Sequence, residues 1–417
     1  MNIDSFVAIG LALIPCIYAV KQNRFFFAIS FFTILLLGVI QTEFLLIIEA
    51  YEISNLFRFE FSKDDLIYTR LVFEIINCIG IFFLYIIPKK NQENIKSHIQ
   101  LTSNFQGIIF SITTLVIIIY TIVISLDTIE TGRPYFQGIG IAIGLLVPFA
   151  LALILLTNNA VFRIVGFFGF LNIFYFSRLF AIFFIMIIVI YKIKLSLLKV
   201  PSLKILIPTI SILILIFLII GQFKHLIGNN VSWRDAILLT LNLNDWLIRM
   251  PTYSDMTNLD KLNLGIFNNY IFGIELGAEV ADCLYRNNIS INNLLGTMND
   301  VYSSLFPSFL RHQLDFDLRD ISCNVAVIKS PLVDLIRAFG YLGVIIFPII
   351  FWTYIRICEM KVNSSNSSFQ IFYICIFGVY SIFLIRGSIG AFVSFSIALF
   401  CAILIIRIVG KKNVKKI

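Results

Sequence analysis

The sequence predicts an all-α polytopic membrane protein with about eleven transmembrane helices and one large loop. Of its 417 residues, 59% are hydrophobic and only 13% are charged, and the mean hydropathy is +0.94. No single soluble core encloses so much apolar surface, and many apolar runs approach the ~20 residues that a helix needs to cross a bilayer. These runs do not alternate with polar residues, which favours helices over the strands of a β-barrel.

Eight spans are predicted before the large loop and three after it. They are expected at 6–20, 25–41, 71–87, 108–124, 139–156, 164–176, 179–191, 205–220, 337–354, 369–384 and 391–406. The segment 163–194 is the least regular, because its first candidate is shorter than a full span; one long tilted helix and a short one are the alternative there. The N-terminus begins with an acidic rather than a basic residue, so it is predicted to be a retained span and not a signal peptide.

Basic residues gather in one set of alternate connections between these spans. The set contains Lys21, Arg24, Lys89, Lys90, Lys96, Arg163, Lys192, Lys194, Lys199, Lys204, Arg356, Lys361 and the lysines of the C-terminal tail. Short basic connections face the cytoplasm. With eleven spans, the N-terminus and the large loop are therefore expected outside, and the C-terminus inside. Because the net charge of +8 comes from these clusters, it does not indicate a nucleic-acid partner.

The chain divides into three regions on this prediction. Residues 1–223 form an N-terminal membrane region of about eight helices, 224–336 the large loop, and 337–417 a C-terminal region of about three helices with a basic tail. The loop is polar and rich in Asn and Asp, so water-soluble chemistry is expected there. Two of the seven cysteines, Cys283 and Cys323, lie in it. They are able to pair in an oxidising compartment, and whether they do is left open.

Arginines recur in the loop and at the outer mouths of the spans. They are Arg178, Arg234, Arg249, Arg286, Arg311, Arg319, Arg337 and Arg386. A guanidinium offers fixed paired donors to phosphate oxygens and stays charged beside a low-dielectric wall, so a diphosphate substrate would need such groups. The alternative is that several lie at the membrane interface or pair with nearby aspartates. Arg178 and Arg337 stand out because each borders an apolar run, where a charge is costly.

A loop carboxylate or histidine is the candidate general base that deprotonates an acceptor hydroxyl. The residues considered are His312, Asp315, Asp317 and Asp334. Asp315 and Asp317 form a D-x-D pattern, but three residues recur easily by chance and no metal is predicted. Glu74 lies within a predicted span, so it requires a polar partner or a cavity.

The segment 329–343 reads KSPLVDLIRAFGYLG and leads into the apolar run VIIFPIIFW. It resembles the Wzy O-antigen polymerases and, more distantly, the O-antigen ligases. The matching positions are Ser330, Pro331, Asp334, Phe339, Gly340 and Gly343. The pair Ser177-Arg178 also looks like one that is common in these families.

Two departures limit this resemblance. Lys329 stands where the ligases have a histidine, which argues against ligase activity; Lys329 would instead contact a diphosphate as a point charge. The paired Arg-x10-Gly loop motifs of the polymerases are not reproduced, since Arg286 and Gly296 have nine residues between them.

The resemblance implies a GT-C-like glycosyltransferase that polymerises undecaprenyl-diphosphate-linked repeat units of O-antigen or capsule. It places the reaction on the periplasmic face of a bacterial inner membrane, in lipopolysaccharide biosynthesis. The candidate catalytic residues are Arg178, Arg249, Arg311, Arg319, Lys329 and Arg337. Neither a metal nor a cofactor is implied. The expected partners are lipid-linked oligosaccharides and membrane lipid. A regulator of chain length is a further candidate partner.

Three other functions are weighed against the polymerase. A flippase or transporter of lipid-linked sugars is expected to carry charges along a path inside its spans and to have short outer loops. A ligase requires the histidine that Lys329 replaces. A membrane acyltransferase is expected to bring a histidine into a span, and none is found in the predicted spans.

Overall fold

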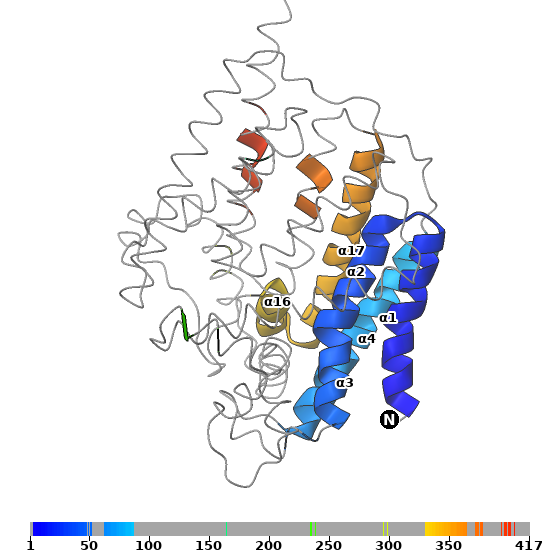
Figure 1. Ribbon diagram of the computed structural model, residues 1–417, viewed down its shortest axis with the longest axis vertical. Coiled ribbons are helices and arrows are strands. Elements are labelled where there is room, and N and C mark those ends of the chain that lie inside the picture. The colour runs from blue at the N-terminus through cyan, green and yellow to red at the C-terminus, as the bar shows by residue number, and fades with distance from the viewer. Residues whose placement is uncertain are drawn as a thin grey trace, which may run out of the picture.

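A computed structural model describes the two ends of the chain in most detail (Figure 1). The described residues are 3–47, 49, 51, 62–86, 164, 234, 235, 238, 295, 298, 330–364, 372–374, 376, 377, 393, 396, 397, 399–401 and 404. Most of the large loop and the predicted spans between 108 and 220 lie outside this set. The following description concerns the described residues.

The described segments are helical. In chain order they are α1 (Ile3–Lys21), α2 (Phe25–Ile34), the π-helix η1 (Leu35–Val39), α3 (Ile40–Ile47), α4 (Lys63–Ile86), α16 (Pro331–Phe339) and α17 (Tyr341–Ser364). Three stretches within them, Asp4–Lys21, Lys63–Ile86 and Tyr341–Val362, are long and apolar enough to cross a membrane. The chain is therefore a helical membrane protein, as its composition predicts.

Two helices begin at points that local chemistry determines. α4 begins at Lys63, earlier than the predicted Leu71, because Ser62 and Asp65 cap it reciprocally. The Ser62 N–H donates to Asp65 Oδ2 at 2.7 Å, and the Asp65 N–H donates to Ser62 Oγ at 3.2 Å. Such a capping box allows a helix to start in a polar stretch. α17 begins at Tyr341 rather than Arg337, because Gly340 ends the preceding helix.

The second predicted span continues past residue 41 to Ile47 as α2, η1 and α3. Within η1 the Ile40 N–H donates to Leu35 O, five residues back, which defines the π turn. The extra residue of such a turn rotates all later residues by about 100° relative to an uninterrupted α-helix. The Phe73 ring packs against Gly38 at this point, and any larger side chain there would overlap it.

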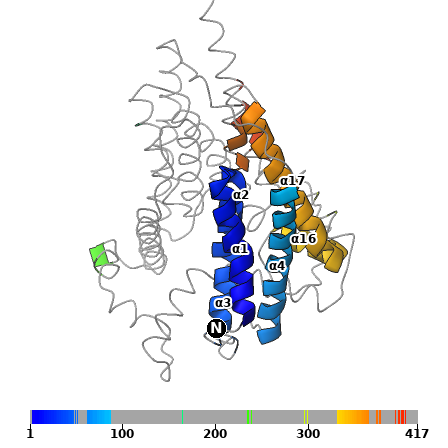
Figure 2. The same ribbon diagram turned by 90° about the vertical axis from the view of Figure 1, so that its right-hand side faces the viewer.

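Contacts at the helix ends establish the relative directions of the helices. Arg24, between α1 and α2, contacts the C-terminal turn of α4 and Glu359 near the end of α17. Arg70, near the start of α4, contacts the start of α1 and Glu43 in α3. Hence α1, α4 and α17 run in one direction and α2–η1–α3 runs in the opposite one (Figures 1 and 2). These directions agree with the predicted alternation of spans.

An aromatic cluster around Trp352 joins α2, α4 and α17. Trp352 is fully buried, and its ring centroid lies 5.5, 4.5 and 5.0 Å from those of Phe27, Phe31 and Phe351. Its Nε1–H donates to Ile76 O at 2.8 Å. Because an indole N–H in an apolar interior needs an acceptor, this bond orients the ring against α4.

Gly80 permits this contact, since a Cβ there would overlap the Trp352 ring and lie 2.9 Å from Phe31 Cζ. We expect Gly80→Ala to lower the free energy of unfolding by about 1–3 kcal/mol, because two packed rings must shift. Thermal unfolding of purified protein in detergent measures the loss. Gly10→Ala is the matched control, because its nearest neighbour, Ile14 Cδ1, would be 3.9 Å away. Equal melting temperatures for the two variants would contradict this account of the packing.

Candidate functional site

Four of the predicted site residues are described, and they belong to one structural unit. Asp334 and Arg337 lie in α16, and Gly340 and Gly343 form the junction with α17. The other candidates lie outside the described residues: Arg178, Arg249, Arg311, Arg319, Lys329, His312, Asp315 and Asp317. Cys283 and Cys323 lie outside them as well.

Three polar residues of α16 share one face of the helix. Ser330 is the N-cap of α16. Pro331 occupies the first helical position, where the fixed φ of proline matches that of a helix. Ser330, Asp334 and Arg337 follow at intervals of four and three residues, so they form a single stripe along the helix. Ser330 is 0% and Asp334 5% exposed. The Asp334 N–H donates to Ser330 O at 2.9 Å, which closes the first turn.

The rest of α16 is also enclosed. Leu332 and Ile336, on the side away from the stripe, and Val333, beside it, are all at most 1% exposed. A helix of nine residues with both faces covered is held by its surroundings, because so short a helix is marginal on its own. Its polar stripe therefore occupies a defined position inside the protein rather than on a solvated surface.

The two motif glycines build a sharp corner between α16 and α17. Gly340 has φ 58°, a conformation that glycine adopts without steric cost. Its N–H donates to Ile336 O at 2.7 Å, and the Gly343 N–H donates to Gly340 O at 3.0 Å. A Cβ on Gly343 would overlap the Leu335 carbonyl. The corner thus requires glycine at both positions, and it sets the place of the polar stripe beside the start of a span.

Arg337 lies in the last turn of α16, not at the opening of the following span as predicted. The physical reason is the break at Gly340. Burial lowers the pKa of the Arg337 guanidinium, but an arginine remains charged at neutral pH because its ordinary pKa lies far above neutrality. A half-buried permanent cation near a membrane span is suited to an anionic ligand.

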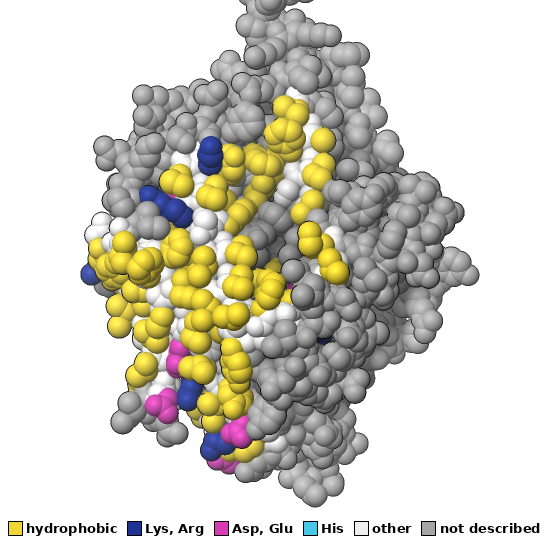
Figure 3. Space-filling model, turned by 180° about the vertical axis from the view of Figure 1, so that it is seen from behind, with side chains coloured by type: hydrophobic (Ala, Val, Ile, Leu, Met, Phe, Trp, Pro, Cys, Tyr) yellow, Lys and Arg dark blue, Asp and Glu magenta, His cyan; other side chains and the backbone are white. Residues whose placement is uncertain are grey.

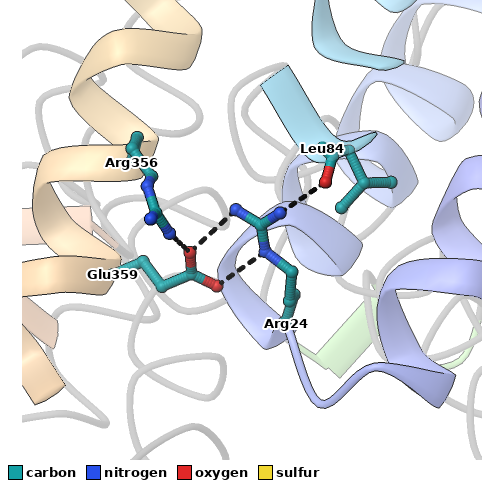
Figure 4. Close-up of polar contacts among 4 residues, drawn as sticks. All are labelled: Arg24, Leu84, Arg356 and Glu359. Atoms are coloured by element: carbon teal, nitrogen blue, oxygen red, sulfur yellow. Dashed lines mark hydrogen bonds and ion pairs between the residues drawn. The ribbon is translucent and has the colours of Figure 1, made fainter. Parts of the chain in front are cut away.

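A buried ion network that the sequence did not predict lies where the C-terminal parts of α4 and α17 meet the start of α2 (Figure 4). Glu359 accepts hydrogen bonds from Arg24 Nε at 3.2 Å, from Arg24 Nη2 at 3.0 Å and from Arg356 Nη1 at 2.6 Å. The Arg24 Nη1 also donates to Leu84 O, one of the last carbonyls of α4. These carbonyls have no donor within their own helix, so Arg24 caps α4.

The sequence placed Arg24 and Arg356 among the basic connections that mark the cytoplasmic side. In the structure the Arg24 side chain is only 3% exposed and also lies over the Phe27 ring, 4.2 Å from its centroid. The feature of the sequence that could have indicated this network is Glu359, an acidic residue between the basic residues Arg356 and Lys361. The network ties α2, α4 and α17 together, and we assign it a structural role.

A second charged group, the Arg70 cluster, consists of Arg70, Asp4, Glu43 and Glu74. Arg70 lies 3.8 Å from Asp4 Oδ2, 3.6 Å from Glu43 Oε1 and 3.8 Å from Glu74 Oε1. Glu74, predicted to need a polar partner or a cavity, thus has Arg70 one turn earlier as its partner. Figure 3 shows acidic side chains gathered near the end at which α1 begins. Among the described residues, no group of three His, Cys, Asp or Glu side chains is placed to hold a metal ion.

Comparison with known families, with curated proteins and with solved structures found no significant match.

Proposed function

We propose that this protein polymerises lipid-linked oligosaccharide repeat units at the outer face of a bacterial inner membrane. The observation that carries the proposal is the 329–343 motif, in which Ser330, Asp334 and Arg337 share one stripe of a short enclosed helix. That stripe stands at the start of a span, where a lipid diphosphate in the bilayer would present its charge. The predicted external position of the large loop and its many arginines support the same function.

The reaction in this proposal transfers a growing glycan from one undecaprenyl diphosphate to the sugar end of a new lipid-linked unit. The bond between the anomeric carbon and the diphosphate oxygen breaks, and a bond to the acceptor hydroxyl oxygen forms. The lipid diphosphate leaves with the electron pair, and the hydroxyl proton passes to a base. Arg337 and the loop cations would stabilise the charge that develops on the leaving group, an effect that often dominates catalysis. A carboxylate such as Asp334 would accept the proton or position the acceptor.

Deletion of the gene tests this function directly. The expected result is a cell surface with single-repeat glycans, because units would still be made and exported but not joined. Persistence of long chains in the deletion strain would rule out the polymerase.

A transporter of lipid-linked sugars is the second candidate. One observation favours it: Arg70, in the membrane-length helix α4, lies 3.6 Å from the buried Glu43 of α3, and ionisable side chains inside the bundle are what a polar path would require. The deletion experiment separates the two functions, because loss of a transporter would accumulate unexported lipid-linked units inside the cell. A ligase is disfavoured by Lys329.

Replacement of Arg337 tests the proposed site within this function. We expect Arg337→Gln to abolish glycans longer than one repeat at normal protein levels, because the leaving diphosphate loses a paired donor. Arg337→Lys should retain part of the activity, since it keeps the charge but not the planar fork. Lys361→Gln is the control, because Lys361 is an exposed basic residue near the opposite end of α17 and should not affect glycan length. Full-length glycan from Arg337→Gln would remove Arg337 from the site.

A further inference from the structure

The members of the Arg70 cluster differ in their access to water. The side chain of Asp4 is 69% exposed, Glu74 22%, Arg70 15% and Glu43 2%. The cluster therefore leads from a solvated carboxylate at the start of α1, past a half-buried guanidinium, to an enclosed carboxyl group on α3. A small ion from water at this end of the bundle has a polar route to Glu43.

Glu43 points into the cluster without a hydrogen bond. Neither of its carboxyl oxygens has a hydrogen-bond partner, and its distance of 3.6 Å from Arg70 exceeds the ~2.7–2.9 Å of a charge-assisted bond. An ionised carboxylate buried in this way loses its hydration and gains little in return, whereas a neutral carboxyl group loses far less.

The charge balance of the cluster also favours a neutral carboxyl group over an ionised one. Three ionised carboxylates against one guanidinium would leave a net charge of −2, and of the three carboxylates only Asp4 is well exposed to water. The facing half of α17, residues 341–355, carries no charged side chain, and the start of α4 adds the exposed Lys63 and Asp64 and the partly exposed Asp65. Carboxylates that share one site resist simultaneous ionisation, and the group then binds a proton as a unit.

Asn77 extends the polar surface of α4 one turn further into the bundle. It follows Arg70 and Glu74 at the spacing that keeps all three on one helix face. Asn77 is 0% exposed, and neither its Oδ1 nor its Nδ2 has a hydrogen-bond partner. A buried amide left in this state is costly, and it adds an unfilled donor and acceptor beside the carboxyl groups.

We propose that the Arg70 cluster is a proton-binding site in which Glu43 and Glu74 hold one proton taken from water at the Asp4 end of the bundle. A hydronium ion transfers its proton to a carboxylate oxygen and leaves as water, so the cluster charge changes from −2 to −1. Because the cluster joins α1, α3 and α4, their packing at this end follows the proton concentration on that face of the membrane. This inference is independent of the proposed function.

Infrared difference spectroscopy of the full chain in nanodiscs, recorded through a pH titration, tests the site. The wild type should show the carbonyl stretch of a neutral carboxylic acid at neutral pH, and the band should vanish as the pH is raised. Glu43→Gln or Glu74→Gln should remove it, because glutamine has the shape of the neutral acid without the proton. Asp64→Asn, which changes an exposed carboxylate of the same helix, should leave the band in place.

Two results would overturn the proposal. One is the absence of any carboxylic acid band from the wild type at neutral pH. The other is a band that survives both Glu43→Gln and Glu74→Gln. If the buried Glu43→Gln does not fold, the half-buried Glu74→Gln and the wild-type titration decide. A band removed by only one substitution supports the site and assigns the proton to that residue.

Discussion

Glu359→Ala should unfold at a markedly lower temperature than the wild type. The substitution leaves the guanidinium groups of Arg24 and Arg356 buried without the carboxylate that accepts three of their hydrogen bonds. Breaking a buried ion pair by removing one partner typically costs about 3–5 kcal/mol. Thermal unfolding of purified protein in detergent measures the effect.

Two variants show whether the lost stability comes from this network. Lys361→Ala, at an exposed position on the same helix, should leave the melting temperature close to that of the wild type. The double variant Arg24→Met with Glu359→Leu should be more stable than Glu359→Ala, because it removes the main charge pair and replaces it with apolar volume. A Glu359→Ala protein as stable as Lys361→Ala would show that the network contributes little.

Gly343→Ala should abolish long glycans on the proposed function. Its Cβ would overlap the backbone carbonyl of Leu335 and lie 2.7 Å from the Ile336 nitrogen. The atoms that the new Cβ would overlap are backbone atoms of α16. Unlike a side chain, they cannot rotate away, so the whole helix must shift. Displacement of catalytic groups by about 1 Å can reduce a rate on the order of 100-fold. Glycan length on the cell surface, compared at equal protein levels, measures the loss.

Leu342→Ala is the control for this corner. Leu342 is the neighbouring residue and is exposed, so its truncation should leave both the corner and the glycan unchanged. Full-length glycan from Gly343→Ala would show that the position of α16 does not govern the reaction, even if the corner itself is strained.

The two glycines of the 329–343 motif entered the sequence analysis only as part of the family resemblance. The structure gives them a physical role, because they form the corner between α16 and α17. The sequence did not indicate a separate helix before the corner, because Pro331–Phe339 is short and its apolar residues merge with the span that follows. Whether Asp334 and Arg337 act on a diphosphate stays a prediction that the proposed variants test.

The sequence by itself determined that this is a helical membrane protein, because the apolar length of a segment is a local property that decides whether it can cross a bilayer. It also located three membrane-length helices approximately, although the structure corrects the starts of two of them. It also marked Glu74 as needing a partner. Only the tertiary structure decided which charges meet. Arg24 and Glu359 are 335 positions apart in the chain, and each looks like an ordinary charge near a helix end. Their pairing depends on the direction and packing of three helices, which no local pattern encodes.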